Sequence, residues 1–275
     1  MKNSVLLFLF LLSPFSVLAE NITWYTLNRP PWFMENGNGY GDHMQASYMV
    51  LLPQFQHVSK KVNLARMFAD MKKGRRLCIS ALAVLPAMRQ YMYLSKTTYV
   101  LPRPKIFMKS KTYFKMGSPA SLSIKELAAN SNYRMGIIGG VKHLPVQPED
   151  YRDSAHVSII SNTAPIISIM KMVSLGRIDW SADFPHMMQW GAGSGVTHID
   201  DTFTMVNIAE YQGMGGLKAG IACSKSAWGQ VIIDQLNILV DKEIILAHRE
   251  LTSKWMPPGP VREEYFRLNK SEFGY

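Results

Sequence analysis

The sequence predicts an α/β fold built on largely parallel sheets. Short segments rich in β-branched and aromatic residues alternate with amphipathic segments of helical period, and this alternation is typical of sheets with helices on their faces. Apolar residues make up 47% of the 275 residues, which is ample for a hydrophobic core. A chain of this length indicates one large domain or two lobes of about 100–150 residues each.

The first half of the chain begins with an expected strand at residues 22–26, which are β-branched and aromatic. A loop of prolines, aromatics and glycines follows, and a helix is expected from near Asp42 to about residue 55. Residues 64–71 carry apolar side chains at positions i, i+3, i+4 and i+7, which predicts an amphipathic helix. Gly74 can end this helix in the left-handed conformation, and the apolar run at residues 77–84 predicts a buried strand.

The second half repeats the alternation. Ser123 and Glu126 form a capping box that opens a short helix, and a strand is expected at residues 133–138. The remaining expected elements are a helix at residues 165–175, short strands at 178–182 and 219–223, a long helix from near Ser226, and a final helical segment that ends near Trp255.

Residues 1–19 are expected to form a cleavable secretory signal. A lysine supplies the charged start, residues 5–12 form an apolar run, and Val17 and Ala19 place small residues before the expected cleavage. The apolar run is too short to span a bilayer, although an uncleaved anchor is the alternative. No cysteine follows the cleavage point as it would in a lipoprotein. The sequence therefore predicts a free, exported, soluble protein of 256 residues.

The formal net charge of +10 is concentrated in one segment. Residues 58–115 contain fourteen Lys and Arg residues and one acidic residue, Asp70. A strongly basic region attracts anions such as acidic ligands, anionic lipid or cell-wall polymers, whereas nucleic acid is not expected outside the cytoplasm. The alternative is a solvated basic face that only keeps the protein soluble.

Cys78 and Cys223 are the two cysteines of the chain. An oxidising compartment permits a disulfide between them. Each also lies in an apolar run, where a buried free thiol is ordinary. The sequence leaves both states open.

The common catalytic and cofactor motifs are missing. The seven histidines are scattered, without HExxH spacing or a Cys/His cluster, so a zinc site is not expected. The segment around Ser194 lacks the spacing of a nucleophile elbow, and the chain has no Walker A loop or dinucleotide fingerprint. The eighteen methionines lie mostly at helical spacings, as core residues do. No catalytic residue, metal or cofactor is therefore predicted.

Three segments follow one another in an informative order. Residues 24–42 combine a strand, an aromatic loop and the sequence G-Y-G-D. Residues 71–95 combine M-K-K-G, a buried strand, an arginine and L-S, and residues 175–183 read L-G-R-I-D-W-S-A-D. This order resembles the type II periplasmic solute-binding proteins of family 3, the amino-acid-type group. The chain is more similar to a branch without a defined ligand than to a defined amino-acid binder.

The resemblance implies a two-lobed fold of the periplasmic-binding-protein type II. Each lobe would be a mainly parallel sheet flanked by helices, and two crossover strands would join the lobes. By this pattern, lobe one comprises residues 20–102 and 216–275, and lobe two comprises residues 103–215. The hinge would lie near residues 99–104 and 216–222, with the ligand in the cleft.

The resemblance also implies two charged ligand contacts. In the family, an arginine after the second motif pairs with the ligand carboxylate, because a guanidinium offers a planar bidentate fork. Arg89 is the candidate, although Met88 stands where the arginine is usual, and a surface arginine is the alternative. An acidic residue after the third motif binds the ligand ammonium group in the family. Asp183 is the candidate here, with a cap or turn residue as its alternative.

Further contacts are expected from a glycine loop and from the aromatic loop. Backbone N–H groups after a strand can face an anion, and a valine and a lysine in place of a hydroxyl residue favour an acidic or larger ligand. The aromatic residues would form an apolar wall over the ligand or part of the core. The expected contacts besides Arg89 and Asp183 are Trp32, Phe33, Tyr40, Ala81, Gly140, Val141 and Lys142.

These features predict a monomeric, periplasmic solute-binding protein rather than an enzyme. It would capture a small polar ligand, anionic or zwitterionic and amino-acid-like, by lobe closure and hand it to an ABC-type membrane permease. Two alternatives stay open. A dehydratase-like enzyme on the same scaffold would need an acid or base with a shifted pKa facing the ligand. A ligand-sensing or envelope-binding module with a degenerate pocket would bind a partner through the basic residues 58–115.

Overall fold

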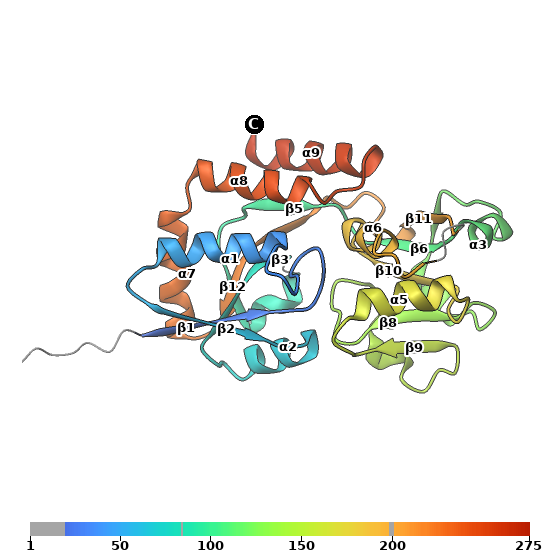
Figure 1. Cartoon of the computed structure of the whole chain (residues 1–275), viewed down its shortest axis with the longest axis horizontal. Coiled ribbons are helices and arrows are strands. Elements are labelled where there is room, and N and C mark those ends of the chain that lie inside the picture. Colours follow the sequence, from blue (N-terminus) through green and yellow to red (C-terminus); the bar gives the residue numbers. More distant parts are fainter. Residues whose placement is uncertain (1–19, 84, 198–200) are drawn as a thin grey trace, which may run out of the picture.

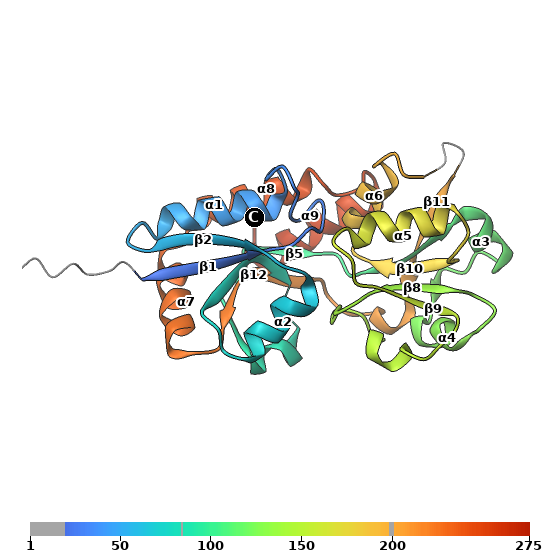
Figure 2. The same ribbon diagram turned by 60° about the horizontal axis from the view of Figure 1, so that its bottom comes forward.

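The computed structural model describes residues 20–83, 85–197 and 201–275, and the expected signal at residues 1–19 lies outside these ranges. The described chain forms two α/β lobes side by side, each built on a six-stranded sheet flanked by helices (Figures 1 and 2). The two-lobed α/β fold expected from the sequence is therefore confirmed. None of the helices in the described ranges is both long and apolar enough to cross a membrane.

Lobe one holds the sheet with strand order β2-β1-β3-β12-β4, and β5 also pairs with β12. Its strands are β1 (Asn21–Thr26), β2 (Gln56–Lys61), β3 (Leu77–Ala83), β4 (Met92–Leu94), β5 (Tyr99–Leu101) and β12 (Leu217–Ser224). Its helices are α1 (Tyr40–Leu51), α2 (Leu64–Lys72), η1 (Pro86–Gln90), α7 (Ala227–Leu239), α8 (Lys242–Ser253) and α9 (Pro260–Phe273).

Lobe two holds the sheet with strand order β7-β11-β6-β10-β8-β9. Its strands are β6 (Lys105–Lys109), β7 (Ser121–Leu122), β8 (Met135–Ile138), β9 (Val157–Ile160), β10 (Trp180–Asp183) and β11 (Phe203–Ile208). Its helices are α3 (Ser110–Lys115), α4 (Ile124–Ala129), η2 (Pro148–Tyr151), α5 (Pro165–Ser174), α6 (Pro185–Ala192) and η3 (Ala209–Tyr211).

Both sheets mix parallel and antiparallel pairs. β1 runs parallel to β2 and β3, and β8 runs parallel to β9 and β10. The antiparallel pairs involve β12 in lobe one and β6 in lobe two. These are the strands that follow the two passages of the chain between the lobes, β5 to β6 and β11 to β12. The strand that enters each lobe after a passage, β6 or β12, therefore pairs antiparallel with its neighbours, whereas the strands linked by helices pair in parallel.

The capping signals in the sequence act as expected. The Asn63 side chain accepts a hydrogen bond from the Arg66 amide at the start of α2, and Gly74 follows this helix with φ of +66°. Ser123 opens α4 by accepting from the Glu126 amide, and Ser226 caps α7. These local contacts fix the helix boundaries because they satisfy N–H groups that have no partner within the helix.

Several elements lie where the sequence analysis expects none, including β6, β9, α6 and β11. Two cases show why. The sequence predicts no strand at Gln56–Lys61, because this edge strand is polar, basic and mostly exposed and has no apolar alternation; it forms by pairing with β1 along its full length. A helix ends near Trp255 as expected, since α8 ends at Ser253, but the expectation that it is the final helix is wrong. Gly259, with φ of +78°, redirects the chain, and Pro260 at the first helical position starts the further helix α9.

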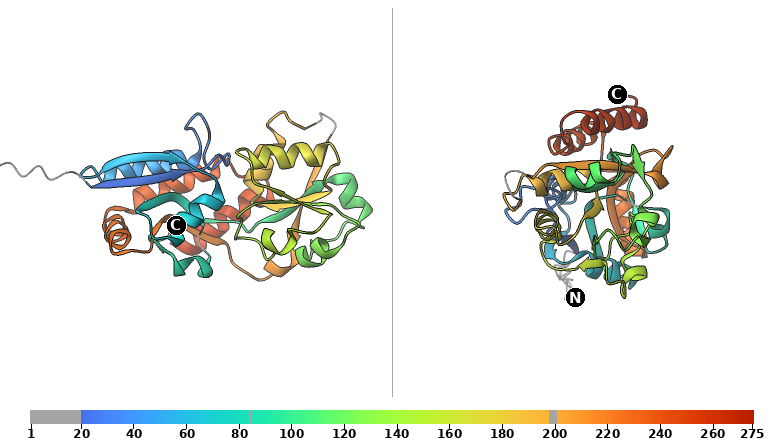
Figure 3. Two further views of the ribbon diagram at one scale, coloured as in Figure 1. Left: turned by 90° about the horizontal axis from the view of Figure 1, so that it is seen from below. Right: turned by 90° about the vertical axis from the view of Figure 1, so that its right-hand side faces the viewer.

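Helix α9 is bound to the first passage between the lobes and lies along one edge of the molecule (Figure 3). The fully buried Asn269 accepts a hydrogen bond from the Val100 amide (2.9 Å) and donates one to the Val100 carbonyl (2.8 Å). Glu264 of α9 also lies 3.6 Å from Lys105 of β6. Helix α9 therefore contacts the first passage at both of its ends, at Val100 of β5 and at Lys105 of β6.

A disulfide joins Cys78 of β3 to Cys223 of β12, so the pairing that the sequence left open is present. The two cysteines are fully buried at the centre of lobe one and are 145 residues apart in the sequence. The bond therefore ties the N-terminal and C-terminal contributions to one sheet.

We expect the double substitution Cys78→Ala and Cys223→Ala to lower stability by about 2–5 kcal/mol, because closing so long a loop restricts the unfolded chain. Thermal unfolding followed by circular dichroism measures the change. Wild-type protein unfolded in reductant serves as the control and should approach the variant. Equal melting temperatures for variant and oxidised wild type would contradict the expectation.

Candidate functional site

The lobes meet where the connecting loops leave their strands. Lobe one contributes the loop after β1, the start of α2 and the end of β3, and lobe two contributes the loops after β8, β9 and β10. Figure 2 shows these segments facing each other between the two sheets. The candidate site is this interface.

An ion pair between Arg29 and Asp183 crosses the interface. Arg29 Nη2 donates to Asp183 Oδ2, and the side chains are 4% and 0% exposed. The other carboxylate oxygen of Asp183 accepts from His143 Nε2 (3.1 Å) and from the Phe184 amide (2.8 Å). We call this set the inter-lobe ion pair, since it binds the loop after β1 to the end of β10.

Asp183 is ionised in this setting. Burial alone would raise the pKa of its carboxyl group, but the charge of Arg29 and the interactions with His143 and the Phe184 amide hold the pKa well below its usual range. A buried carboxylate is stable only when it is paired and hydrogen-bonded in this way.

A second polar contact between the lobes lies beside the ion pair. The Tyr40 hydroxyl and His186 Nε2 are 3.0 Å apart, and both side chains are buried. Burial lowers the pKa of His186 to about 3, so its imidazole is neutral near pH 7. No partner among the described residues binds His186 Nδ1.

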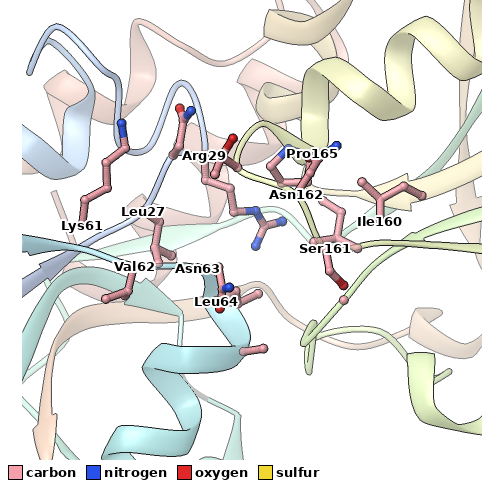
Figure 4. Close-up of a pocket in the computed structure, with 15 residues that line it drawn as sticks. Leu27, Arg29, Lys61, Val62, Asn63, Leu64, Ile160, Ser161, Asn162 and Pro165 are labelled. Atoms are coloured by element: carbon pink, nitrogen blue, oxygen red, sulfur yellow. The ribbon is translucent and has the colours of Figure 1, made fainter.

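Two of the cavities between the lobes are lined in part by Arg29 of the inter-lobe ion pair. The large cleft cavity, of about 340 Å³, is lined by Leu27, Asn28, Arg29, residues 61–65, Ile138, Gly139, residues 160–163 and Pro165 (Figure 4). The small cleft cavity, of about 30 Å³, is lined by Arg29, Trp32, Tyr40, Leu64, Phe68, residues 81–83, Met88, Leu101, Lys142, His143, Phe184 and Met187. The large cavity is in the size range of ligand pockets, whereas the small one holds little more than a water molecule.

Four of the nine site residues expected from the sequence line the small cleft cavity. Trp32, Tyr40, Ala81 and Lys142 line it. Ala81 adopts a positive φ of +59° within β3, a conformation that is costly for a residue with a Cβ.

The other expected residues lie in different places. Phe33 is fully buried with its ring 5.0 Å from that of Trp32, and Val141 is buried in the core. Arg89 is exposed in η1 and lines neither of the two cleft cavities, while its neighbour Met88 lines the small one. Asp183 lies at the interface, where Arg29 is its partner.

Gly140 brings the lobes into close contact. It has φ of +83°, and a Cβ at this position would lie 3.0 Å from the backbone nitrogen of Ala65 across the interface. A glycine is required here both by the left-handed backbone and by the approach of α2.

Sequence reasoning missed three central residues: Arg29, His143 and His186. Arg29 directly precedes the proline pair of the aromatic loop. This position is the signal that could have identified it, because a charged residue there enters the interface. The histidines gave no signal, since their partners lie 40 and 146 residues away. Within the described residues, no group of three or more His, Cys, Asp or Glu side chains could hold a metal ion.

No protein-family model matches the chain, and no curated protein is similar enough in sequence to match it. Comparison of folds is informative. A structure from work on glutathione import via GshT and the cystine ABC importer TcyBC of Streptococcus mutans has a TM-score of 0.64 at 11% identity, over 86% of this chain and 95% of that one.

Two further solved structures have the same fold. A histidine kinase sensor domain similar to periplasmic binding proteins has a TM-score of 0.61 at 11% identity, over 86% of this chain and 95% of that one. A Salmonella typhimurium periplasmic binding protein described as highly specific for arginine has a TM-score of 0.59 at 11% identity, over 86% and 99%. The chain therefore has the two-lobed fold of the type II periplasmic binding proteins.

The substitution Asp183→Asn is expected to separate the lobes, because it leaves the Arg29 charge buried without its partner. The loss in stability should be about 3–5 kcal/mol, and small-angle X-ray scattering should give a larger radius of gyration. Asp179→Asn is the matched control, since Asp179 pairs with the half-exposed Arg134 within lobe two and its loss should cost about 0–1 kcal/mol. Equal effects of the two variants would refute a dominant role of the inter-lobe ion pair.

Stability is expected to fall between pH 7 and pH 5. Burial lowers the pKa of His186 to about 3 and that of His248 to about 4. The unfolded chain binds these protons near pH 6.5, so below that pH each histidine removes about 1.4 kcal/mol of stability per pH unit until its folded pKa is reached. Melting temperatures measured across this range should show a shallower slope for His248→Gln, and an unchanged slope for the exposed control His43→Gln. A flat profile for wild type would contradict the assignment.

Proposed function

We propose that this protein is an extracytoplasmic solute-binding protein that captures a small anionic or zwitterionic solute between its lobes and delivers it to a membrane transporter. The observation that carries the proposal is the large cleft cavity, whose walls come from both lobes. A ligand bound there contacts both lobes at once, so it favours the arrangement in which they are closed.

The proposed hinge agrees with the path of the chain. We propose lobe boundaries at residues 102–103 and 215–216, between β5 and β6 and shortly before β12. Arg103 is in this connection, where its Nε donates to the Gly215 carbonyl (2.7 Å) and its guanidinium lies 5.1 Å from the Tyr211 ring centroid. The two connections are thus bonded to each other, which would make them bend together.

The transporter partner rests on the similar structures. Two of them are substrate-binding proteins of amino-acid ABC transporters. Delivery to such a permease requires the lobes to open and release the solute, so both inter-lobe contacts must be reversible. An export signal at residues 1–19 would place the protein where such partners act.

A sensing module is the second candidate. The inter-lobe ion pair and the Tyr40–His186 contact join the lobes through the protein's own side chains. Lobes that are held closed by contacts within the protein suit a sensor domain, in which the ligand changes a signal. They suit less well a carrier that must open and close repeatedly. Similar structures include a histidine kinase sensor domain and a BvgS VFT2 domain.

An enzymatic role has less support. His143 and Asp183 are hydrogen-bonded at the small cleft cavity, but that cavity has no room for a substrate. His186 lines neither of the two cleft cavities. The similar structures whose names state a role are binding proteins and sensor domains.

The direct test is a thermal-shift screen of the purified protein against amino acids, organic acids and muropeptides. A solute that binds only the folded state raises the melting temperature, by an amount that grows with its concentration. Scattering measurements on the best compound should show an unchanged or more compact molecule. The absence of a shift with every compound, for a protein that is well folded, would refute solute binding.

Gly140→Ala tests whether that binding needs contact between the lobes. The added Cβ would press on Ala65 and keep the lobes apart. The apparent affinity for the ligand, measured by the thermal shift, should therefore fall at least about tenfold. Gly117→Ala is the control: Gly117 has the same positive φ in lobe two, but open space surrounds its Cβ position. If both variants bind as wild type does, the ligand does not lie between the closed lobes.

A further inference from the structure

The large cleft cavity has apolar walls on both sides. Lobe one supplies Leu27, Val62 and Leu64, and lobe two supplies Ile138, Ile160 and Pro165. Figure 4 shows Val62 and Leu64 on one side and Ile160 and Pro165 on the other. A ligand that fills this space must therefore carry a substantial apolar body.

The charged groups at this cavity are all positive. Arg29 and Lys61 are the charged residues among its lining, and no Asp or Glu lines it. In Figure 4 the Arg29 guanidinium lies between Leu64 of lobe one and Ser161 of lobe two. Arg29 is almost fully buried, and its Nε has no hydrogen-bond partner among the described residues. A buried N–H without a partner is costly, and the guanidinium carries its positive charge at the edge of this cavity.

Two helices begin at the same cavity. Asn63 caps the third amide of α2, and no acceptor within the described chain is found for the amides of Leu64 and Ala65. Across the cavity α5 begins at Pro165, and its N-cap Ala164 offers no side-chain acceptor. Helix N-termini carry partial positive charge and favour anions.

The site cannot satisfy an ammonium group. Both oxygens of Asp183 are engaged, Oδ2 by Arg29 and Oδ1 by His143 and the Phe184 amide. The cavity lining adds no other carboxylate. An ammonium group enclosed there would lose its hydration without gaining a counter-charge, and it would lie beside Arg29.

We propose that the large cleft cavity binds small carboxylates that have an apolar body and no ammonium group, in preference to amino acids. This inference rests on the proposed solute-binding function and narrows its ligand class. The carboxylate lies beside the Arg29 guanidinium and accepts from the free amides at the start of α2. Lys61, which also pairs with the exposed Glu35, attracts it at the solvent side. The apolar body contacts the aliphatic walls of both lobes.

Matched ligand pairs test the proposal by isothermal titration calorimetry. The pairs are 4-methylpentanoate with leucine, 3-phenylpropanoate with phenylalanine and pentanoate with norvaline, which differ only by the amino group. We expect at least one carboxylate to bind about tenfold or more tightly than its amino acid. 4-Methylpentanamide, which has the same body without the charge, should bind more weakly than 4-methylpentanoate.

Variants at the cavity wall locate the carboxylate. Thr163 is exposed on the wall just before α5, so Thr163→Asp adds a negative charge without disturbing the core, and Thr163→Asn is its neutral control. The aspartate variant should bind the carboxylate about tenfold more weakly than the asparagine variant. Lys61→Gln should weaken binding severalfold, whereas Lys60→Gln, on the same strand but outside the cavity lining, should not.

The outcomes separate this inference from the proposed function. Amino acids that bind as tightly as their carboxylate partners would overturn the inference and leave solute binding intact. Carboxylates that bind equally well to Thr163→Asp and Thr163→Asn would also overturn it, since the charge would then lie elsewhere. If neither these pairs nor any compound of the wider screen binds, both proposals fail together.

Discussion

The buried ion pair between Arg29 and Asp183 is the constraint on which the arrangement of the lobes depends. It joins residues 154 positions apart, and neither charge is stable in the interface without the other. The loop after β1 must therefore lie against the end of β10 whenever the lobes are closed. This approach in turn brings Gly140 onto Ala65 and Tyr40 onto His186.

The same ion pair determines where a solute can lie. Arg29 takes up the Asp183 carboxylate and its side chain enters the space beside Trp32 and Tyr40, so the cavity there is only about 30 Å³. A cavity of about 340 Å³ lies on the other side of Arg29, towards the starts of α2 and α5. Arg29 thus fills the space next to the residues that the sequence pattern singles out, and a cavity remains in a neighbouring part of the cleft.

Local signals in the sequence predict much of the fold but little of the site. Short segments carry these signals, such as the periodicity of residues 64–71, the cap at Ser123 and the ordered motifs. The structure confirms the helices that the first two predict, α2 and α4. The exposed edge strand β2 and helix α9 have no such signal, since pairing with β1 and packing on β5 form them. Asp183 could be singled out from its position after a motif. Its partner could not, because their contact exists only after two lobes have formed and closed.

The contacts between the lobes also limit how a ligand acts. A ligand shifts the balance between open and closed lobes only by the difference in its affinity for the two states. When protein side chains already hold the lobes together, the population of open lobes that a ligand must convert to closed lobes is small. Little of the ligand's binding free energy is then needed for closure. Release then requires that the Arg29–Asp183 pair be broken and solvated, which is slow unless another contact compensates.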